Sequence, residues 1–325
     1  MKSSFVKLTI FALLTTAFIS GLLAFSNSRG HDVPVAGEEN YSSGDERNRR
    51  FEKQFTVAEG GDLIVESDAG TVKIDSWEKN EVSVVVEVEG SDSRAEKYRV
   101  EFKQEGNTVY VIGKVRDKSF FKWHVGNLEA YYTIKVPKKF NTKVNTSGGN
   151  VDAAKLTGKV DYSTSGGNIN VESIEGLTVV STSGGNVDLR NVIGDVDAET
   201  SGGNVVCENV VGNVKGFTSG GDVEVRSVDG RVKAGTSGGS IVIKVTGENK
   251  GIDAETSGGD IDILVKEGIA ADIDAETSGG SVDCDLPVTV RGKVRDSELH
   301  GKINGGGNPI RAETSGGSIR IATLR

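Results

Sequence analysis

Proline, cysteine and positive charge are scarce in this sequence. Among 325 residues there are four prolines and two cysteines, and the formal net charge at pH 7 is −9. The shortage of proline excludes long proline-rich linkers, and a single possible disulfide excludes the dense cross-linked framework of small secreted domains. The negative charge and the lack of a basic stripe exclude nucleic-acid binding, because affinity for phosphate backbones comes from clustered Lys and Arg.

Side chains that commonly carry catalysis are also sparse. The three histidines, His31, His124 and His300, are isolated from one another, and no serine lies in a nucleophile-elbow pattern. We interpret His300 as a surface-loop residue. We expect no enzyme, no catalytic residues and no cofactor. A polysaccharide-active β-helix enzyme is the least favoured class, because such enzymes carry their carboxylates in long loops that the short repeats below lack.

Glycine, in contrast, is abundant, with 44 residues, and much of it recurs in one motif. The quartet Thr-Ser-Gly-Gly occurs nine times, and its first five intervals are 18 residues each. Counting Thr as position one, positions six and eight are apolar, as are most residues at fifteen and seventeen, with mostly polar residues between them. Such alternation is typical of short half-buried strands. The quartets begin at Thr146, Thr164, Thr182, Thr200, Thr218, Thr236, Thr256, Thr277 and Thr314.

Each coil of the repeat is therefore expected to contain two strands and two glycine corners. One coil cannot bury its apolar side alone, so identical positions must stack at the strand spacing of about 4.8 Å. The sequence thus predicts an all-β fold, a parallel β-solenoid (β-helix) with coils of about 18 residues. A left-handed helix of hexapeptides is excluded, because the apolar residues do not recur every six positions.

The quartet itself is interpreted as a corner and not as a phosphate-binding loop, because nothing helical follows it. We expect its two glycines to permit positive φ, and its threonine to point inward and pass a hydrogen bond to the neighbouring coil. The residue after the quartet, for example Asn168 or Asn186, is expected to join a ladder of side-chain amides. The glycine and aspartate pattern of calcium-binding rolls is absent from the second corner.

The regular repeat is preceded by a different β-rich region. Residues 51–145 alternate with period two and predict an antiparallel, hairpin-rich N-terminal cap that includes one degenerate coil, Asp62–Trp77. The solenoid repeat region is expected to span residues 146–325, with an insertion at about 286–308.

The N-terminal residues predict export. Residues 1–26 are typical of a signal peptide or signal anchor, because Lys2 and Lys7 precede an apolar run over residues 8–25. Residues 27–50 are polar and have no apolar period, which predicts a disordered tether.

Two Asp-Ala-Glu strands are the best candidates for a metal site. Asp253 and Glu255 precede one quartet, and Asp274 and Glu276 precede the next. If the two strands are neighbours, their like charges come to roughly 5 Å and favour a divalent cation between them. We nevertheless favour a plain solvated acidic face and assign no metal ligand; a weak divalent-cation or cationic-surface site is the alternative.

Both cysteines occupy position eight, which points into the predicted core. Three coils are expected between Cys207 and Cys284, a separation of roughly 20 Å that no disulfide spans. We therefore expect two buried free thiols.

Two stretches and the quartet ladder form a recognisable frame. These are residues 55–84, with Trp77 after the first coil, and residues 132–151, with Val136 and Pro137 before the repeats. Together they resemble the bacterial putative-adhesin family of β-strand-repeat proteins, an exported family with a domain of unknown function. The resemblance implies a β-solenoid at the cell envelope and brings no established catalytic residues.

These observations predict a non-enzymatic exported protein that binds or scaffolds at the bacterial envelope, either in the periplasm, at the surface or secreted. Flat, repetitive faces suit extended partners such as glycans or envelope proteins. The alternative is a self-associating structural envelope protein, because the final half coil, residues 314–325, would leave a C-terminal strand edge open to another copy unless the insertion at residues 286–308 covers it.

Overall fold

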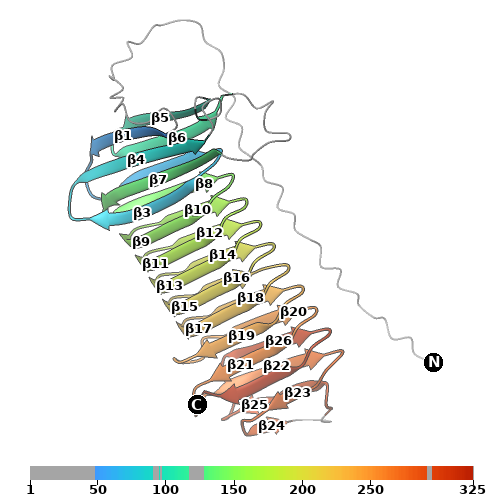
Figure 1. The fold of residues 1–325 in the computed structure, drawn as a ribbon. Coiled ribbons are helices and arrows are strands. Elements are labelled where there is room, and N and C mark those ends of the chain that lie inside the picture. Colours follow the sequence, from blue (N-terminus) through green and yellow to red (C-terminus); the bar gives the residue numbers. More distant parts are fainter. Residues whose placement is uncertain (1–47, 91–94, 96, 117–127, 291–294, 325) are drawn as a thin grey trace, which may run out of the picture. The chain divides into compact units, whose positions relative to one another are not determined.

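The computed structural model describes residues 48–90, 95, 97–116, 128–290 and 295–324, and the elements in these ranges are β-strands. They form two sheets that face each other, A with 13 strands and B with 14 (Figure 1). The expected leader, residues 1–26, and most of the expected tether lie outside the described residues. The predicted all-β parallel solenoid with an antiparallel cap is confirmed.

The order of strands across sheet A is β1 (Asn48–Thr56), β4 (Glu81–Gly90), β7 (Leu128–Pro137), β3 (Thr71–Trp77), β9 (Val151–Thr157), β11 (Ile169–Glu175), β13 (Val187–Ile193), β15 (Val205–Val211), β17 (Val223–Asp229), β19 (Ile241–Val245), β21 (Ile261–Val265), β27 (Ile319–Thr323) and β23 (Val282–Cys284). The order across sheet B is β24 (Val288–Val290), β25 (Glu298–Ile303), β22 (Ala271–Thr277), β26 (Pro309–Thr314), β20 (Ile252–Thr256), β18 (Val232–Thr236), β16 (Val214–Phe217), β14 (Val196–Thr200), β12 (Thr178–Thr182), β10 (Val160–Thr164), β8 (Phe140–Thr146), β2 (Gly61–Ser67), β6 (Thr108–Val115) and β5 (Tyr98–Glu105).

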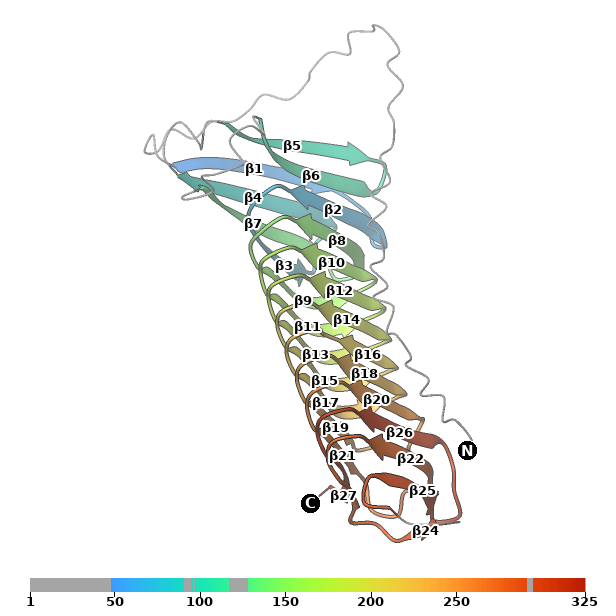
Figure 2. The same ribbon diagram turned by 90° about the vertical axis from the view of Figure 1, so that its right-hand side faces the viewer.

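Each regular coil contributes one strand to each sheet, and identical positions of successive coils stand in register. Val187 pairs with Val205, and Val196 with Val214, in parallel ladders. The apolar positions point between the sheets and are almost fully buried, as at Leu189. The period of 18 residues therefore matches one full circuit of the chain through both sheets (Figure 2).

The quartet threonine behaves as expected. Thr182 donates its hydroxyl hydrogen to the carbonyl oxygen of Gly167, at 2.8 Å, and Thr200 repeats the bond to Gly185 at 2.7 Å. Each acceptor is the second quartet glycine of the preceding coil. A buried hydroxyl thus satisfies a backbone carbonyl at each quartet corner, which links neighbouring coils.

The quartet glycines are not explained by positive φ, which was the expected reason. In the quartet at Thr182, neither Gly184 nor Gly185 adopts a left-handed φ. A Cβ on the second, Gly185, would overlap the carbonyl group of Gly167 in the preceding coil, whereas a Cβ on Gly184 would meet nothing closer than 3.7 Å. Close stacking, and not φ, therefore makes the second glycine necessary.

In the regular coils, the left-handed residues other than glycine lie within the strands of sheet A, where the ladder skips one residue. Position ten has a φ of 53–59° in five successive coils, at Lys155, Ser173, Asn191, Asn209 and Ser227. Asn adopts this region more readily than most residues do, so Asn191 and Asn209 were the available sequence signal.

The ladder after the quartet also differs from the expected amide ladder. The backbone N–H of Asn186 donates to Oδ1 of Asn168 at 2.8 Å, and the same bond joins Asn204 to Asn186. The bonds therefore run from backbone to side chain, which explains why Asp222 can replace Asn: it accepts from Ser240 at 2.7 Å.

At the N-terminal end, the coil made by β2 and β3 lies between two others. β2 pairs in parallel with β6 and β8, and β3 pairs in parallel with β7 and β9. The chain thus returns to stack β6 and β7 outside its first coil before it continues at β8. The antiparallel strands β1, β4 and β5 close this end.

The C-terminal end is also assembled out of chain order. β26 and β27 insert between β20 and β21 on one side and β22 and β23 on the other. The insertion expected at about 286–308 contains the antiparallel strands β24 and β25, which extend sheet B.

This arrangement corrects the expectation that the final half coil leaves a free strand edge. β27 is paired on both sides, so Ile319 and Ile321 are buried between neighbouring strands. The C-terminal strand therefore cannot pair with another copy as expected.

The cysteines are correspondingly further apart than expected. Four strands of sheet A, and not three, lie between the strands of Cys207 and Cys284, a separation of about 24 Å. Both thiols are free, but only Cys207 is buried, whereas Cys284 lies near the end of the stack and is half-exposed. Burial raises the pKa of the Cys207 thiol to about 12, so it remains an unreactive core residue.

Candidate functional site

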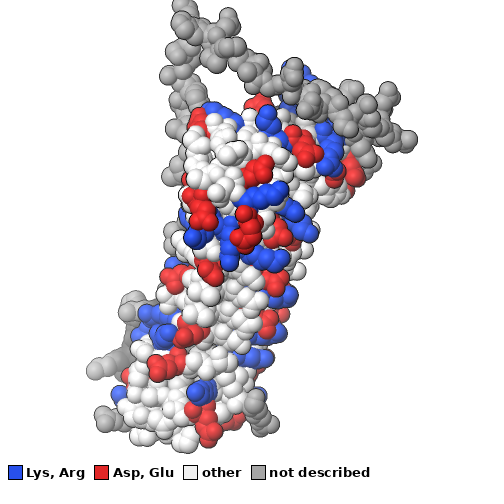
Figure 3. Space-filling view, turned by 90° about the vertical axis from the view of Figure 1, so that its left-hand side faces the viewer, with Lys and Arg blue, Asp and Glu red and all other residues white. Residues whose placement is uncertain are grey.

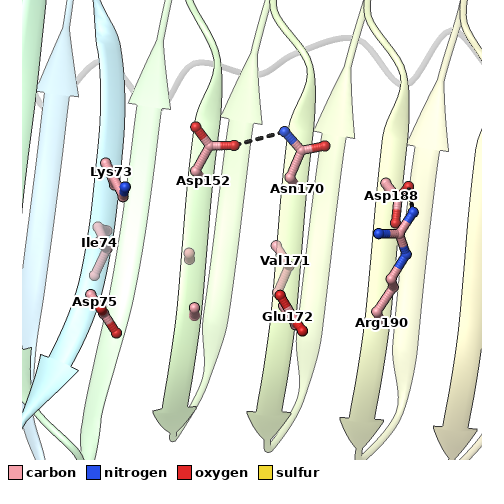
Figure 4. Close-up of a pocket in the computed structure, with 11 residues that line it drawn as sticks. Lys73, Ile74, Asp75, Asp152, Asn170, Val171, Glu172, Asp188 and Arg190 are labelled. Carbon is pink, nitrogen blue, oxygen red and sulfur yellow. Dashed lines mark hydrogen bonds and ion pairs between the residues drawn. The ribbon is translucent and has the colours of Figure 1, made fainter.

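The outer face of sheet A contains a shallow groove where one side chain is short. Position nine points to solvent and carries long charged side chains in most coils, but β9 carries Ala154 there. The missing bulk leaves a hollow of about 260 Å³ across β3, β9, β11 and β13 (Figure 4). The long side chains at this position in the following coils are Glu172, Arg190, Glu208, Arg226 and Lys244.

Both acidic and basic groups line this sheet A groove, as they do the surrounding face (Figure 3). Asn170 donates a hydrogen bond to Asp152 at 2.7 Å, and Arg190 contacts Asp188 at 2.7 Å. Lys73 and Glu172 also line the groove, and neither forms an ion pair with another described residue. The groove therefore offers a free cation and a free carboxylate beside fixed hydrogen-bonding groups.

A second hollow, of about 170 Å³, lies on the outer face of sheet B and contains all four acidic residues singled out from the sequence. The pairs do not lie on neighbouring strands as expected, because β26 inserts between β20 and β22. Arg311 stands opposite Asp253 on one side and opposite Asp274 on the other. The positively charged Arg311 therefore lies between Asp253 and Asp274 and replaces the direct repulsion expected between them.

The next row of the same face is wholly acidic. Four glutamates stand in register on adjacent strands, which places like charges one strand spacing apart. Burial, and then the charges of Glu313 and Asp253, raise the pKa of Glu255, and Lys233 opposes that shift. The four are Glu255, Glu313, Glu276 and Glu298, in spatial order.

Replacing Glu255 with Gln should raise the melting temperature at pH 7 by about 1–3 °C. A carboxyl whose pKa is raised in the folded protein holds its proton more tightly when folded, so its ionised form destabilises the fold. The gain should be complete above the raised pKa and vanish once the pH falls below the ordinary value of 4.5. Thermal melts from pH 3.5 to 8 measure it.

The matched control for this change is Glu199→Gln. Glu199 lies on the same row, but its neighbours in register are Ser181 and Phe217. Its substitution should give no comparable pH-dependent gain, and equal gains at the two positions would contradict the role of the acidic row.

His300 is the residue of this face that sequence reasoning missed. It lies on β25 and not in a loop, directly opposite Asp274 in the antiparallel ladder. Its Nδ1 is 2.8 Å from Oδ1 of Asp274, and its Nε2 is 3.4 Å from Oε1 of Glu276. The alternating residues of Glu298–Ile303 could have predicted a strand, but they do not indicate which strand it pairs with.

In the described part of the chain, no helix is long and apolar enough to cross a membrane.

Comparison with known proteins relates the fold to a family. A family model described as Toastrack DUF4097 matches residues 61–322. No curated protein matches the chain. Among solved structures, a putative adhesin from Bacteroides fragilis is 16% identical, with 85% of this chain and 97% of that chain covered and a TM-score of 0.41.

Two further structures show lower similarity. A putative lipid binding protein from Parabacteroides distasonis is 12% identical, with 85% and 97% of the two chains covered and a TM-score of 0.32. A putative adhesin from Parabacteroides merdae is 13% identical, with 85% and 96% covered and a TM-score of 0.27. These values are too low to transfer a function.

Proposed function

The chain belongs to the Toastrack DUF4097 family, and we propose a function from the chain's own surface. The protein is a non-enzymatic, exported binding or scaffolding protein of the bacterial envelope. The leader at residues 1–26 directs export, and the residues after it tether the solenoid as far as residue 47, because Asn48–Arg50, expected to belong to the tether, are part of β1. The sheet A groove holds an extended polar partner, such as a glycan or a segment of an envelope protein.

The main support for this proposal is Ala154, whose short side chain interrupts the row of long charged side chains at position nine. An unbroken row of long charged side chains would keep a partner away from the strands, whereas the alanine lets it approach the sheet. The polar groups along the groove come from four adjacent strands at fixed spacing, for example Asp152 and Asn170 on β9 and β11. A rigid row of donors and acceptors suits a ligand whose own polar groups repeat along its length.

The groove is better suited to binding than to acid–base catalysis. Asp152 and Asp188 are each held by a neighbouring side chain, Asn170 and Arg190. General acid–base chemistry on a sugar needs two carboxyl groups that flank the scissile bond within a cleft, and this groove is open and shallow.

Filling the groove tests the proposal. The full chain without its leader is screened against glycans and envelope proteins, and the affinity of the best partner is then measured for Ala154→Arg. A guanidinium side chain at position nine restores the regular row, so the affinity should fall at least about tenfold, about 1.4 kcal/mol.

The control for this variant is Leu264→Arg, an outward residue of β21 in the same row but far along the sheet. It adds the same side chain and charge outside the groove and should keep the affinity within about twofold. Equal losses in both variants, or no loss in Ala154→Arg, would rule out the groove as the binding surface.

Export is tested separately. Tagged full-length protein should appear outside the cytoplasm, and deletion of residues 1–26 should keep it inside. Protease treatment of intact cells then separates surface exposure from a periplasmic position.

A further inference from the structure

A histidine lies between two carboxylates on the outer face of sheet B, at the C-terminal end of the stack. Asp274 and Glu276 are two residues apart on β22, so both project from the same face. His300 projects beside them from β25, because the antiparallel register places it opposite Asp274. One donor atom from each of the three residues lies within 4.8 Å of the other two. Paired backbone strands therefore fix the three groups together.

Both ring nitrogens of His300 face a carboxylate oxygen. Nδ1 is 2.8 Å from Asp274, which is a normal hydrogen-bond distance, and Nε2 is 3.4 Å from Glu276. A neutral imidazole has one N–H and one lone pair. If Nδ1–H donates to Asp274, the lone pair of Nε2 points at an acceptor oxygen of Glu276. A cation bound between these two atoms would accept both lone pairs.

The separation of Nε2 and the Glu276 oxygen fits a metal ion. Zn²⁺ binds imidazole nitrogen and carboxylate oxygen at about 2.0–2.2 Å in tetrahedral geometry, which sets two ligand atoms roughly 3.3–3.5 Å apart. The observed 3.4 Å falls in this range. In zinc sites, the ligating histidine commonly donates its other N–H to a carboxylate, which is the position of Asp274.

We propose that this His300 cluster binds a divalent transition-metal ion of the zinc class. His300 Nε2 and the Glu276 carboxylate are the ligands, Asp274 orients the imidazole ring, and water completes the coordination. Imidazole nitrogen favours Zn²⁺ over Mg²⁺ and Ca²⁺, which prefer oxygen ligands only. The acidic surroundings, including Glu313 on the next strand, add electrostatic attraction for a cation.

The bound ion would join the inserted hairpin to the stack. β24 is paired only with β25 in the described residues, and β25 joins the rest of sheet B through β22 alone. Because Glu276 and His300 lie on either side of that junction, a metal ion would cross-link it and stabilise the C-terminal end of the protein.

Zinc titration of the tag-free full chain tests the proposal. After treatment with a chelator and dialysis, calorimetry with zinc chloride should give one site for the wild type. His300→Gln should weaken it at least about tenfold, and Asp274→Asn by about tenfold or more because the ring loses its orienting partner. Lys302→Gln is the matched control: Lys302 pairs with Asp272 on the same two strands but provides no ligand, so its affinity should match the wild type.

The ¹⁵N resonances of the His300 ring provide a second measurement. On zinc addition, the Nε2 resonance of His300 should shift in long-range ¹H–¹⁵N spectra, while Nδ1 keeps its proton. Zinc should also raise the melting temperature of the wild type and of Lys302→Gln but not of His300→Gln. Undiminished binding by His300→Gln, or no binding by the wild type at 1 mM zinc, would overturn the proposal.

Discussion

Replacing Gly185 with alanine should lower the free energy of unfolding by about 3 kcal/mol or more, whereas the same change at Gly184 should alter it by less than about 0.5 kcal/mol. The two residues are adjacent and share one corner. A Cβ on Gly185 would overlap the backbone carbonyl of Gly167, which cannot move without separating two coils, whereas a Cβ on Gly184 enters open space. Neither residue has a left-handed φ, so the pair separates close packing from backbone strain.

Thermal melts followed by circular dichroism measure this difference. The expected loss corresponds to a decrease of about 6–12 °C in melting temperature for Gly185→Ala. The corner bond adds to the effect, because the carbonyl of Gly185 accepts the hydroxyl of Thr200 at 2.7 Å. Similar melting temperatures for the two variants would show that the coils are not stacked as closely as the structure requires.

Deleting one whole coil should be tolerated, and deleting half of one should not. Removing residues 182–199 joins Ser181 to Thr200, and Thr200 stands in register with the lost Thr182. Val205 then takes the place of Val187 above Ile169. The shortened protein should unfold cooperatively with its β-sheet spectrum unchanged in form.

Removing only residues 182–190 deletes one quartet and the first four residues of β13, so this coil keeps β14 in sheet B but loses most of its strand in sheet A. The next coil must then change sheets, which exposes buried side chains such as Val205, each worth about 1.5–3 kcal/mol of burial. This variant should aggregate or lose cooperative unfolding. Melting curves and gel filtration distinguish the outcomes, and equal behaviour of the two deletions would contradict the 18-residue register.

The central coils could be predicted from the sequence because each repeats the same local rule. Position six is always apolar, from Val151 to Ile319, and each strand pairs with the coil next to it in the chain through β9–β19. The corners were located correctly, but their chemistry was only partly inferred. The contact between Gly185 and Gly167 depends on how closely two coils approach, and residue type alone does not reveal that distance.

The two ends could not be predicted in the same way. The interval of 37 residues before Thr314 signalled an insertion, but not that β26 would enter the stack ahead of β22. The neighbours of Asp274 are therefore Arg311 and His300 rather than Asp253. Strand order at an end depends on pairing between distant segments, and neither the period nor the apolar pattern specifies it. The sequence thus singled out these acidic residues, whereas their neighbours in the sheet required the structure.

The insertion of β26 and β27 determines the order in which the protein can be completed. In the middle of the solenoid, each coil can dock on the previous one as soon as it has been synthesised, because chain order and stacking order agree. At the C-terminal end, β22 and β23 cannot dock on the stack in their final places until the residues of β26 and β27, which lie between them and β20 and β21, exist. A chain that emerges from its N-terminus onward therefore holds this coil undocked until the residues of β26 and β27 have arrived. A chain truncated before Pro309 therefore cannot complete the stack.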